Sequence, residues 1–354
     1  MIVVRTPFRL PLGGGGTDLP SYYHKFEGCL ITAALNKYMY ININQPAIVD
    51  KIKINYSKVE LVDTNSVDTI KHDIVRETLK YLKINYPLEI SSMADLSAGT
   101  GMGSSSSYTV GLLNGLNHLK RRYISTQELA EEACKVEIEL IGKPIGKQDQ
   151  YAAAFGGIVQ LDIDRLGKVT VTPLKLQQEI VYELENRLLM FYTNIERDAN
   201  VILGEQSRKM EDGRGGMEDG MKKAGSKQYV VSEKTDEVSA LEAMHKIKEI
   251  GQEIKKTLID GDICEFGKLM HKHWMTKKNV STKMSNSNID NWYELALKSG
   301  ALGGKIMGAG GGGFLLLCAE NGKRKQLRSA MENAGLKYMD FKFDWEGSKV
   351  LVNI

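Results

Sequence analysis

The sequence predicts an α+β fold, and two observations support that class, while the chain length bounds the number of domains. Short runs rich in β-branched and aromatic residues occur between longer segments with helical spacing of apolar residues. These segments do not follow the steady strand–helix–strand order that is typical of a doubly wound parallel sheet. The chain has 354 residues, of which 42% are hydrophobic and 26% charged, enough for one large or two medium globular domains.

Three strands are predicted in the first hundred residues, at 2–6, 38–44 and 89–95. The third strand leads into a glycine- and serine-rich loop at 99–107. Apolar residues at helical spacing over 110–119 follow this loop. The order here is therefore strand, flexible loop and helix.

A capping box at 125–128 predicts the start of a helix that runs to about Ile141, directly before a glycine. A short helix is predicted from near Gly146 to the glycine pair at 156–157. A hairpin follows, with strands at 159–164 and 168–172 around a glycine.

The second half of the chain is predicted to mix buried strands with two helices. Continuous apolar runs predict buried strands at 187–194 and 313–318, and helical spacing covers 236–259 and 262–275. The last strand is predicted at 348–353.

Residues 209–228 differ from the rest of the chain, because they are rich in charge and glycine and contain few large apolar groups. This composition predicts a mobile surface loop, and a lid over the active site is the alternative.

Charge and cysteine usage argue against several classes of protein. The net charge of +3, without a basic run of five to eight residues, does not indicate a nucleic-acid partner. No apolar run of about 18 residues predicts a membrane span, and the N-terminus does not resemble a signal peptide. The scattered cysteines lack metal-ligand spacing and indicate reduced, mostly buried thiols of a cytoplasmic protein: Cys29, Cys134, Cys264 and Cys318.

Three glycine-rich stretches lie far apart, at 13–16, 99–103 and 308–313. Glycine lets backbone N–H groups approach a ligand closely, because it has no Cβ. Three such stretches predict a chain that surrounds a phosphorylated molecule, which makes phosphoryl transfer the first chemistry to consider.

The second stretch precedes a predicted helix, so its N–H groups and the helix dipole favour an anion. Its serines add hydroxyl donors, and one of them is a candidate Mg²⁺ ligand. The loop is neither a P-loop, since the required lysine is absent, nor a dinucleotide-binding loop. The alternative is a tight turn with a serine helix cap. The candidate phosphate-binding residues are Gly99, Gly101, Gly103, Ser104, Ser105 and Ser106.

Three carboxylates and one arginine are the candidate chemical groups. Glu137 falls on the apolar face of its predicted helix, where either a metal ion or a buried ion pair would compensate its charge. Asp149, in the first turn of the short helix, is a candidate general base, or only a favourable helix charge. Arg9 and Asp18 flank the first glycine stretch and are candidates for phosphoryl and sugar contacts, or for surface ion pairs and turns.

Taken together, these motifs resemble the GHMP superfamily of small-molecule kinases. The resemblance is carried, in order, by 6–18, 99–106, Glu137, 146–150 and 304–314. These segments span nearly the whole chain, and their order makes the resemblance specific.

The resemblance implies two α+β domains, an ATP-binding domain at 1–178 and a C-terminal domain at 179–354, with the active site between them. It implies ATP phosphates on 99–106 and Mg²⁺ on Ser105 and Glu137. It also implies that Asp149 is the catalytic base with Arg9 beside it.

The same resemblance places Asp18, with Thr17 and Gly16, on the sugar. It implies that the third loop supports the site, through Gly308, Gly310 and Gly311.

Within the superfamily, four segments resemble the kinases that phosphorylate the anomeric hydroxyl of D-glycero-D-manno-heptose 7-phosphate, toward GDP-heptose for surface polysaccharides: 13–18, 146–157, 191–197 and 271–278. Such a substrate needs a basic contact for its phosphate, for which Arg197, Lys277 and Lys278 are candidates or else surface charges. Asn194 stands where glycine is commoner in these kinases.

Two alternatives remain at this stage. One is a fucokinase- or galactokinase-like enzyme that acts on an unphosphorylated sugar. The other is a non-catalytic sensor that binds sugar and ATP, which loss of the serines or of Asp149 would favour.

Overall fold

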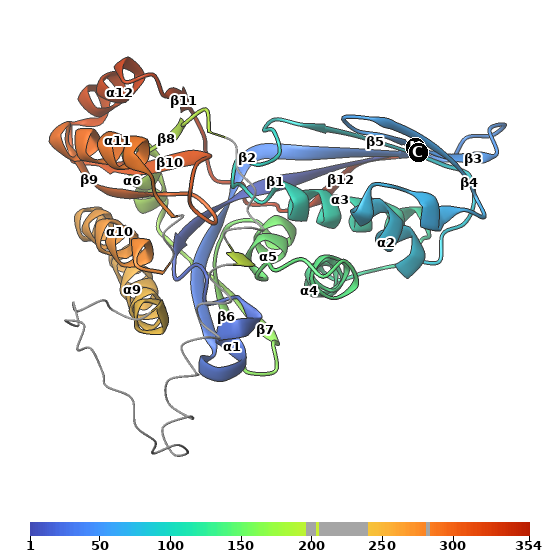
Figure 1. Cartoon of the computed structure of the whole chain (residues 1–354), viewed down its shortest axis with the longest axis horizontal. Coiled ribbons are helices and arrows are strands. Elements are labelled where there is room, and N and C mark those ends of the chain that lie inside the picture. Colours follow the sequence, from blue (N-terminus) through green and yellow to red (C-terminus); the bar gives the residue numbers. More distant parts are fainter. Residues whose placement is uncertain (196–202, 205–239, 281–283) are drawn as a thin grey trace, which may run out of the picture.

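The computed structural model describes residues 1–195, 203–204, 240–280 and 284–354. The predicted loop at 209–228 lies outside the described residues. The rest forms two sheets, each with its own helices, that lie next to each other along the long axis of the molecule (Figure 1). The α+β class is confirmed.

The larger sheet has eight strands, ordered β12-β1-β2-β5-β3-β4, with β6 paired to β2 and β7 to β6. In the described part of the chain, β3 and β5 pair in parallel and the other pairs of this sheet are antiparallel. Its strands are β1 (Ile2–Gly13), β2 (Gly28–Asn44), β3 (Lys51–Asn55), β4 (Val59–Asp63), β5 (Leu88–Ala94), β6 (Ile158–Ile163), β7 (Val169–Pro173) and β12 (Lys349–Asn353).

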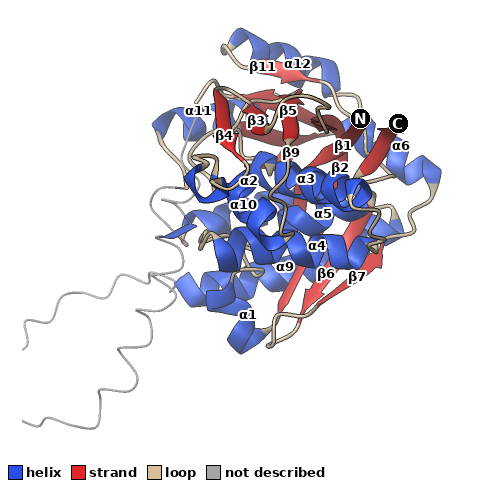
Figure 2. Cartoon of the chain, turned by 90° about the vertical axis from the view of Figure 1, so that its right-hand side faces the viewer, coloured by secondary structure: helices blue, strands red, loops and turns tan. Residues whose placement is uncertain are grey.

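Helices cover one face of the larger sheet (Figures 1 and 2). Glycines bring the long helix α3 close to the strands, since a Cβ at Gly115 would lie 2.6 Å from Ile43 Cδ1 of β2. The helices of this half are α1 (Pro20–Phe26), α2 (Asp73–Tyr81), α3 (Ser104–Leu119), α4 (Thr126–Cys134) and α5 (Gln148–Phe155), with a 3₁₀ turn at Val67–Thr69.

The predicted capping box is confirmed, because Ser125 and Glu128 exchange side-chain and backbone hydrogen bonds at the start of α4. The helix does not continue regularly to Ile141. It changes into a π-helical turn, η2 (Lys135–Leu140), which carries Glu137. Such turns inside α-helices frequently occur at functional sites.

The smaller sheet is antiparallel, in the order β11-β8-β10-β9. Both faces are buried: Phe191 and Leu315 pack with α11 and α12, whereas Met190 and Leu316 face the core that includes α6 and α10. Two-sided burial explains the continuous apolar runs of β8 and β10. The elements are α6 (Gln178–Arg187), β8 (Leu188–Tyr192), α9 (Ala240–Asp260), α10 (Ile263–Lys278), α11 (Ser287–Lys298), β9 (Ala301–Ile306), β10 (Phe314–Ala319), α12 (Arg324–Asn333) and β11 (Lys337–Met339).

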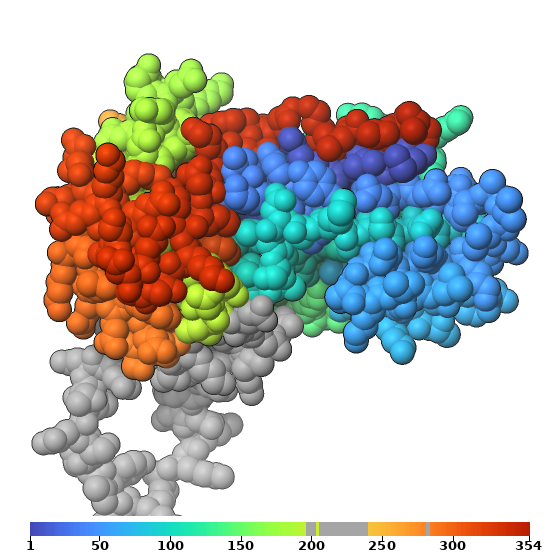
Figure 3. Space-filling view, turned by 90° about the horizontal axis from the view of Figure 1, so that it is seen from above, coloured from blue at the N-terminus to red at the C-terminus, as the bar shows by residue number. Residues whose placement is uncertain are grey.

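The two halves are joined at both ends of the smaller one. After β11 the chain returns to the larger sheet, where β12 pairs antiparallel with β1. Figure 3 shows this red C-terminal segment lying along the blue N-terminal half. The final strand therefore belongs to the N-terminal sheet, which a division into 1–178 and 179–354 does not capture. No helix among the described residues is both long and apolar enough to cross a membrane.

Candidate active site

A cavity of about 750 Å³ lies between the two halves. Its lining joins segments that are more than 290 residues apart in the chain, from Arg9 to Ala309. The predicted residues that it brings together are Arg9, Gly16, Asp18, Gly99, Gly101, Gly103, Ser104, Ser105, Ser106, Asp149, Lys277 and Gly308.

The glycine–serine loop forms one end of this cavity. Gly99, Gly101 and Gly103 have φ angles of +77°, +78° and +78°, a region in which glycine is favoured. Gly103 has a second reason to be glycine, because a Cβ there would lie 3.0 Å from Asp149 Oδ2.

The serines of this loop do not cap the helix. The N-cap position of α3 is Gly103, which provides no side-chain cap. Ser105 instead donates a hydrogen bond to Glu137, and Ser107 donates to the carbonyl of Pro7 at 2.8 Å. The first-turn N–H groups of α3 therefore have no side-chain cap from the N-cap residue. They lie beside a cavity lined by Ser104, Ser105 and Ser106, an arrangement that suits an anion.

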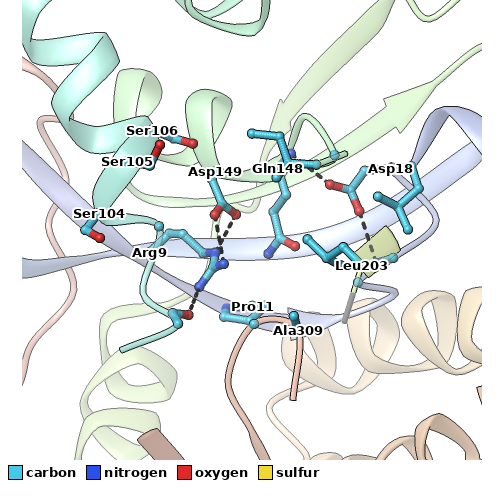
Figure 4. Close-up of a pocket in the computed structure, with 18 of the residues that line it drawn as sticks. Arg9, Pro11, Asp18, Ser104, Ser105, Ser106, Gln148, Asp149, Leu203 and Ala309 are labelled. Atoms are coloured by element: carbon cyan, nitrogen blue, oxygen red, sulfur yellow. Dashed lines mark hydrogen bonds and ion pairs between the residues drawn. The ribbon is translucent and has the colours of Figure 1, made fainter. Parts of the chain in front are cut away.

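Asp149 is held by a bidentate ion pair with Arg9 (Figure 4). Arg9 Nε and Nη2 donate to the two carboxylate oxygens at 2.6 and 2.9 Å, and Nη1 donates to the Gly101 carbonyl at 2.5 Å. The Arg9 side chain is buried, whereas that of Asp149 is 25% exposed and faces the cavity. This fork fixes the carboxylate against the phosphate-binding loop.

Asp18 lies on the other side of Gln148 from Asp149 (Figure 4). It accepts backbone hydrogen bonds from Gly16 and Gln148, each at 3.0 Å. Burial raises the pKa of Asp18, the negative charge of Asp149 adds to this, and the two backbone donors oppose it. A Cβ at Gly146 would lie 1.9 Å from Asp18 Oδ2, so the position of this carboxylate requires glycine at 146.

Glu137 is fully buried and has three side-chain partners. It accepts hydrogen bonds from Ser105 and from Gln150 Nε2, the latter at 2.8 Å, and Lys143 Nζ lies 3.1 Å from its Oε1. The buried ion pair, which is the alternative to a metal ion at this carboxylate, is therefore present. Lys143 also donates to Ser105 Oγ at 2.7 Å, which places its positive charge between the two predicted Mg²⁺ ligands.

The first glycine stretch serves the cavity only in part. Gly15 and Gly16 line it, whereas Gly13 and Gly14 are required by packing. A Cβ at Gly14 would lie 2.3 Å from the Cys29 carbonyl oxygen, and one at Gly13 would lie 2.8 Å from Ile254 Cδ1.

The third glycine stretch supports the site from the C-terminal half. Gly308 lines the cavity. Gly310 and Gly311 pack instead on Met284, whose carbonyl accepts a hydrogen bond from Gly311 N at 2.8 Å. Gly313 lies against the second loop, because a Cβ there would be 2.2 Å from the Thr100 carbonyl oxygen. The two loops thus fix each other.

Two predicted substrate contacts among the described residues, Thr17 and Lys278, are not in the cavity lining. The Thr17 hydroxyl is buried and lies within hydrogen-bond distance of the Gly14 and Cys29 carbonyls, so it fixes the turn after β1. Lys278 forms an ion pair with Asp290 at 2.9 Å outside the cavity. Arg197 lies outside the described residues. Asn194, in the position where glycine is commoner, has a φ of +56°.

Sequence reasoning gave no role to Lys143, His273 and Lys305, which line the cavity, whereas Lys277 is one of the predicted contacts for a substrate phosphate. Lys143 follows a helix-ending glycine and therefore has no periodic signal. His273, Lys277 and Lys305 form a basic wall on α10 and β9. Burial lowers the pKa of Lys305 well below its usual range, and the charges of Lys277 and Arg9 lower it further.

Comparisons with known proteins give the family of this chain. The GHMP kinases N-terminal domain matches residues 70–157, and the GHMP kinases C-terminal domain matches 247–337. D-glycero-alpha-D-manno-heptose 7-phosphate kinase of Campylobacter jejuni is 30% identical over 98% of this chain and 98% of its own. The chain belongs to the GHMP kinase family.

Other similar proteins include a galactokinase and a putative sugar kinase. A galactokinase of Pyrococcus furiosus is 27% identical over 99% of this chain and 97% of its own. The solved structure of a putative sugar kinase from Campylobacter jejuni covers 99% of this GHMP kinase and 97% of its own chain, with 27% identity and a TM-score of 0.72.

The fold of a D-glycero-D-manno-heptose 1-phosphate kinase from Bacteroides thetaiotaomicron matches the whole chain with a TM-score of 0.76 at 24% identity. This chain is thus a sugar kinase of the two-domain GHMP fold, and kinases of this family use ATP.

Proposed function

We propose that this sugar kinase phosphorylates the anomeric hydroxyl of D-glycero-D-manno-heptose 7-phosphate to the 1,7-bisphosphate, a step toward GDP-heptose. One observation carries the chemistry: Asp149, fixed by Arg9, and Asp18 lie in a single cavity beside the N-terminus of α3, which has no side-chain cap. The choice of sugar is supported by the similarity to the heptose 7-phosphate kinase over nearly the full length of both chains.

In this proposal Asp149 acts as the general base. Its carboxylate accepts the proton of the sugar hydroxyl while that oxygen forms a bond to the γ-phosphorus of ATP. The bond from the γ-phosphorus to the β–γ bridging oxygen breaks, and ADP leaves. Arg9 keeps the Asp149 carboxylate in place through its two hydrogen bonds and lies beside the developing phosphoryl charge.

The two ligands would enter from opposite sides of Asp149. The N–H groups and hydroxyls of 99–106 would hold the ATP phosphates. Asp18, the backbone at Gly16 and the side chain of Gln148 would face the sugar. Because its pKa is raised by burial, Asp18 is suited to hydrogen bonding with sugar hydroxyls, which replace the solvent it lacks.

Ser105 and Glu137 fit a role as Mg²⁺ ligands, since a hydroxyl and a carboxylate are oxygen donors of the kind that Mg²⁺ prefers. Lys143 already places a positive charge between them. No group of three or more His, Cys, Asp or Glu side chains in the described ranges could hold a metal alone. The remaining ligands would therefore be phosphate oxygens and water. When bound, Mg²⁺ supplies neutralisation of the phosphate charge.

The test is ATP consumption with Mg²⁺ against a panel of D-glycero-D-manno-heptose 7-phosphate, sedoheptulose 7-phosphate, mannose, L-fucose and galactose. Turnover of the heptose phosphate, with a 1,7-bisphosphate identified by ³¹P NMR, is the expected result. Turnover of a neutral sugar instead would overturn the proposed substrate and favour the galactokinase- or fucokinase-like alternative.

A further inference from the structure

The wall of the cavity that belongs to the C-terminal half carries three basic side chains. His273 and Lys277 are four residues apart on α10, so they lie on the same face of that helix. Lys305, on β9, donates a hydrogen bond to the Leu12 carbonyl of β1 at 2.9 Å. All three residues are at least nine-tenths buried and line the cavity that contains Asp149.

This wall differs from the rest of the cavity in its charge balance. Arg9 and Lys143 each form an ion pair with a carboxylate. Lys305 Nζ instead donates to the neutral Leu12 carbonyl, and one hydrogen bond of Lys277 goes to the Gly308 carbonyl at 2.8 Å. A buried ammonium group such as that of Lys305 is costly beside a cavity, and an anionic ligand would offset that cost.

His273 is the clearest sign that a ligand belongs here. Its side chain is 1% exposed, and neither ring nitrogen has a hydrogen-bond partner within the described structure. The great majority of buried polar groups do have a partner. Since this imidazole lines a cavity large enough for a ligand, a ligand oxygen would supply the missing hydrogen bond.

We propose that His273, Lys277 and Lys305 form the subsite for the phosphate that the sugar substrate already carries. A phosphate monoester offers three acceptor oxygens and about two negative charges, which match one imidazole and two ammonium donors. In the proposed function the ATP phosphates would bind at the N-terminus of α3, in the other half of the molecule. This inference rests on the proposed function, because it requires a substrate that is a sugar phosphate.

The test compares Lys277→Met and Lys305→Met with Lys272→Met, which removes an exposed lysine from the same helix. Lys272 lies 3.6 Å from Glu253 outside the cavity. We expect the KM for the heptose phosphate to rise roughly tenfold or more in the first two variants, as loss of a charge-assisted hydrogen bond implies, with little change in the KM for ATP. Lys272→Met should behave like the wild type, and Lys277→Arg should recover most of the loss.

A second measurement uses inorganic phosphate as the probe. It should inhibit the wild type competitively with the sugar phosphate, and inhibition should weaken roughly tenfold in Lys277→Met. Thermal unfolding establishes which variants are folded. If Lys305→Met does not fold, the test relies on Lys277→Met and His273→Gln. His273→Gln should also raise the KM for the sugar phosphate.

The outcomes separate this subsite from the proposed function. If the wild type turns over the heptose phosphate and the variants keep its KM, the subsite is wrong and the function stands. A rise in the KM for ATP alone would assign the wall to the nucleotide and also overturn the subsite. Turnover of neutral sugars only would overturn the proposed function, and the subsite with it.

Discussion

The two walls of the cavity differ in how their charged side chains are compensated. On the N-terminal wall, ion pairs join Asp149 to Arg9 and Lys143 to the buried Glu137, and backbone N–H groups hold Asp18. On the C-terminal wall the charges that lower the pKa of His273, after burial itself, are those of Lys305 and Lys277, both cations.

The difference separates two tasks that a kinase site must perform. Matched pairs fix side chains in position before substrate arrives, which suits groups that take part in the chemical step. An excess of one charge is stabilised only when a ligand brings the opposite charge, which suits recognition. Substitutions on the two walls should therefore affect different kinetic constants.

The largest effect is expected for Asp149→Asn. The amide keeps the shape of the side chain but cannot accept the proton of the hydroxyl, so kcat should fall by about 10²- to 10⁴-fold. ATP binding and the thermal midpoint should change little, because Asn can still accept one hydrogen bond from Arg9. A variant that kept most of its kcat would show that Asp149 is not the general base.

An intermediate effect is expected for Glu137→Gln. The neutral amide is a weaker Mg²⁺ ligand and leaves Lys143 without its buried partner, so the Mg²⁺ concentration for half-maximal rate should rise about tenfold. The measurement is a Mg²⁺ titration at saturating ATP.

Glu139→Gln is the matched control for this substitution, since Glu139 lies two residues away on η2 and is exposed. Equal Mg²⁺ requirements in the two variants would show that Glu137 is not a metal ligand and that its ion pair with Lys143 is purely structural.

The smallest effect is expected on stability at acidic pH. Burial lowers the pKa of His273, so the folded protein keeps this ring neutral where the unfolded chain, with a pKa near 6.5, takes up a proton. Its contribution to the free energy of unfolding should fall as the pH drops from about 7.5 to 5.5, by up to about 1.4 kcal/mol.

Urea denaturation of the wild type and of His273→Gln at the two pH values measures this contribution. The variant should lose less stability than the wild type on acidification, and the exposed histidine substitution His24→Gln serves as control. An unchanged pH dependence in His273→Gln would indicate that the C-terminal wall does not hold a neutral imidazole.

The N-terminal wall of the cavity could be predicted from the sequence better than the basic wall. Glu137 could be found because a carboxylate among apolar residues at helical spacing is costly alone, and Asp149 because it opens a short helix. Lys143, which neutralises Glu137, follows the end of the helix, where no periodicity constrains the direction of a side chain. Its pairing depends on tertiary structure.

The basic wall shows how a single residue decides a prediction. Each helical residue is rotated by about 100° from the one before it, so Lys277 faces the cavity and Lys278 faces Asp290. The four-residue spacing from His273 to Lys277 was a usable signal for this choice. The contact of Lys305 with β1 could not be predicted from the sequence, because it joins residues nearly 300 positions apart.

The return of β12 to β1 also has a consequence for biosynthesis. One edge of β1 has no partner until residues 349–353 have left the ribosome, and unpaired strand edges readily pair with other chains. The larger sheet therefore stays incomplete, with one edge of β1 unpaired, until the C-terminal half has been translated. A stop codon or a proline introduced into the last strand should thus lower the yield of soluble enzyme, although that strand contributes no residue to the cavity lining.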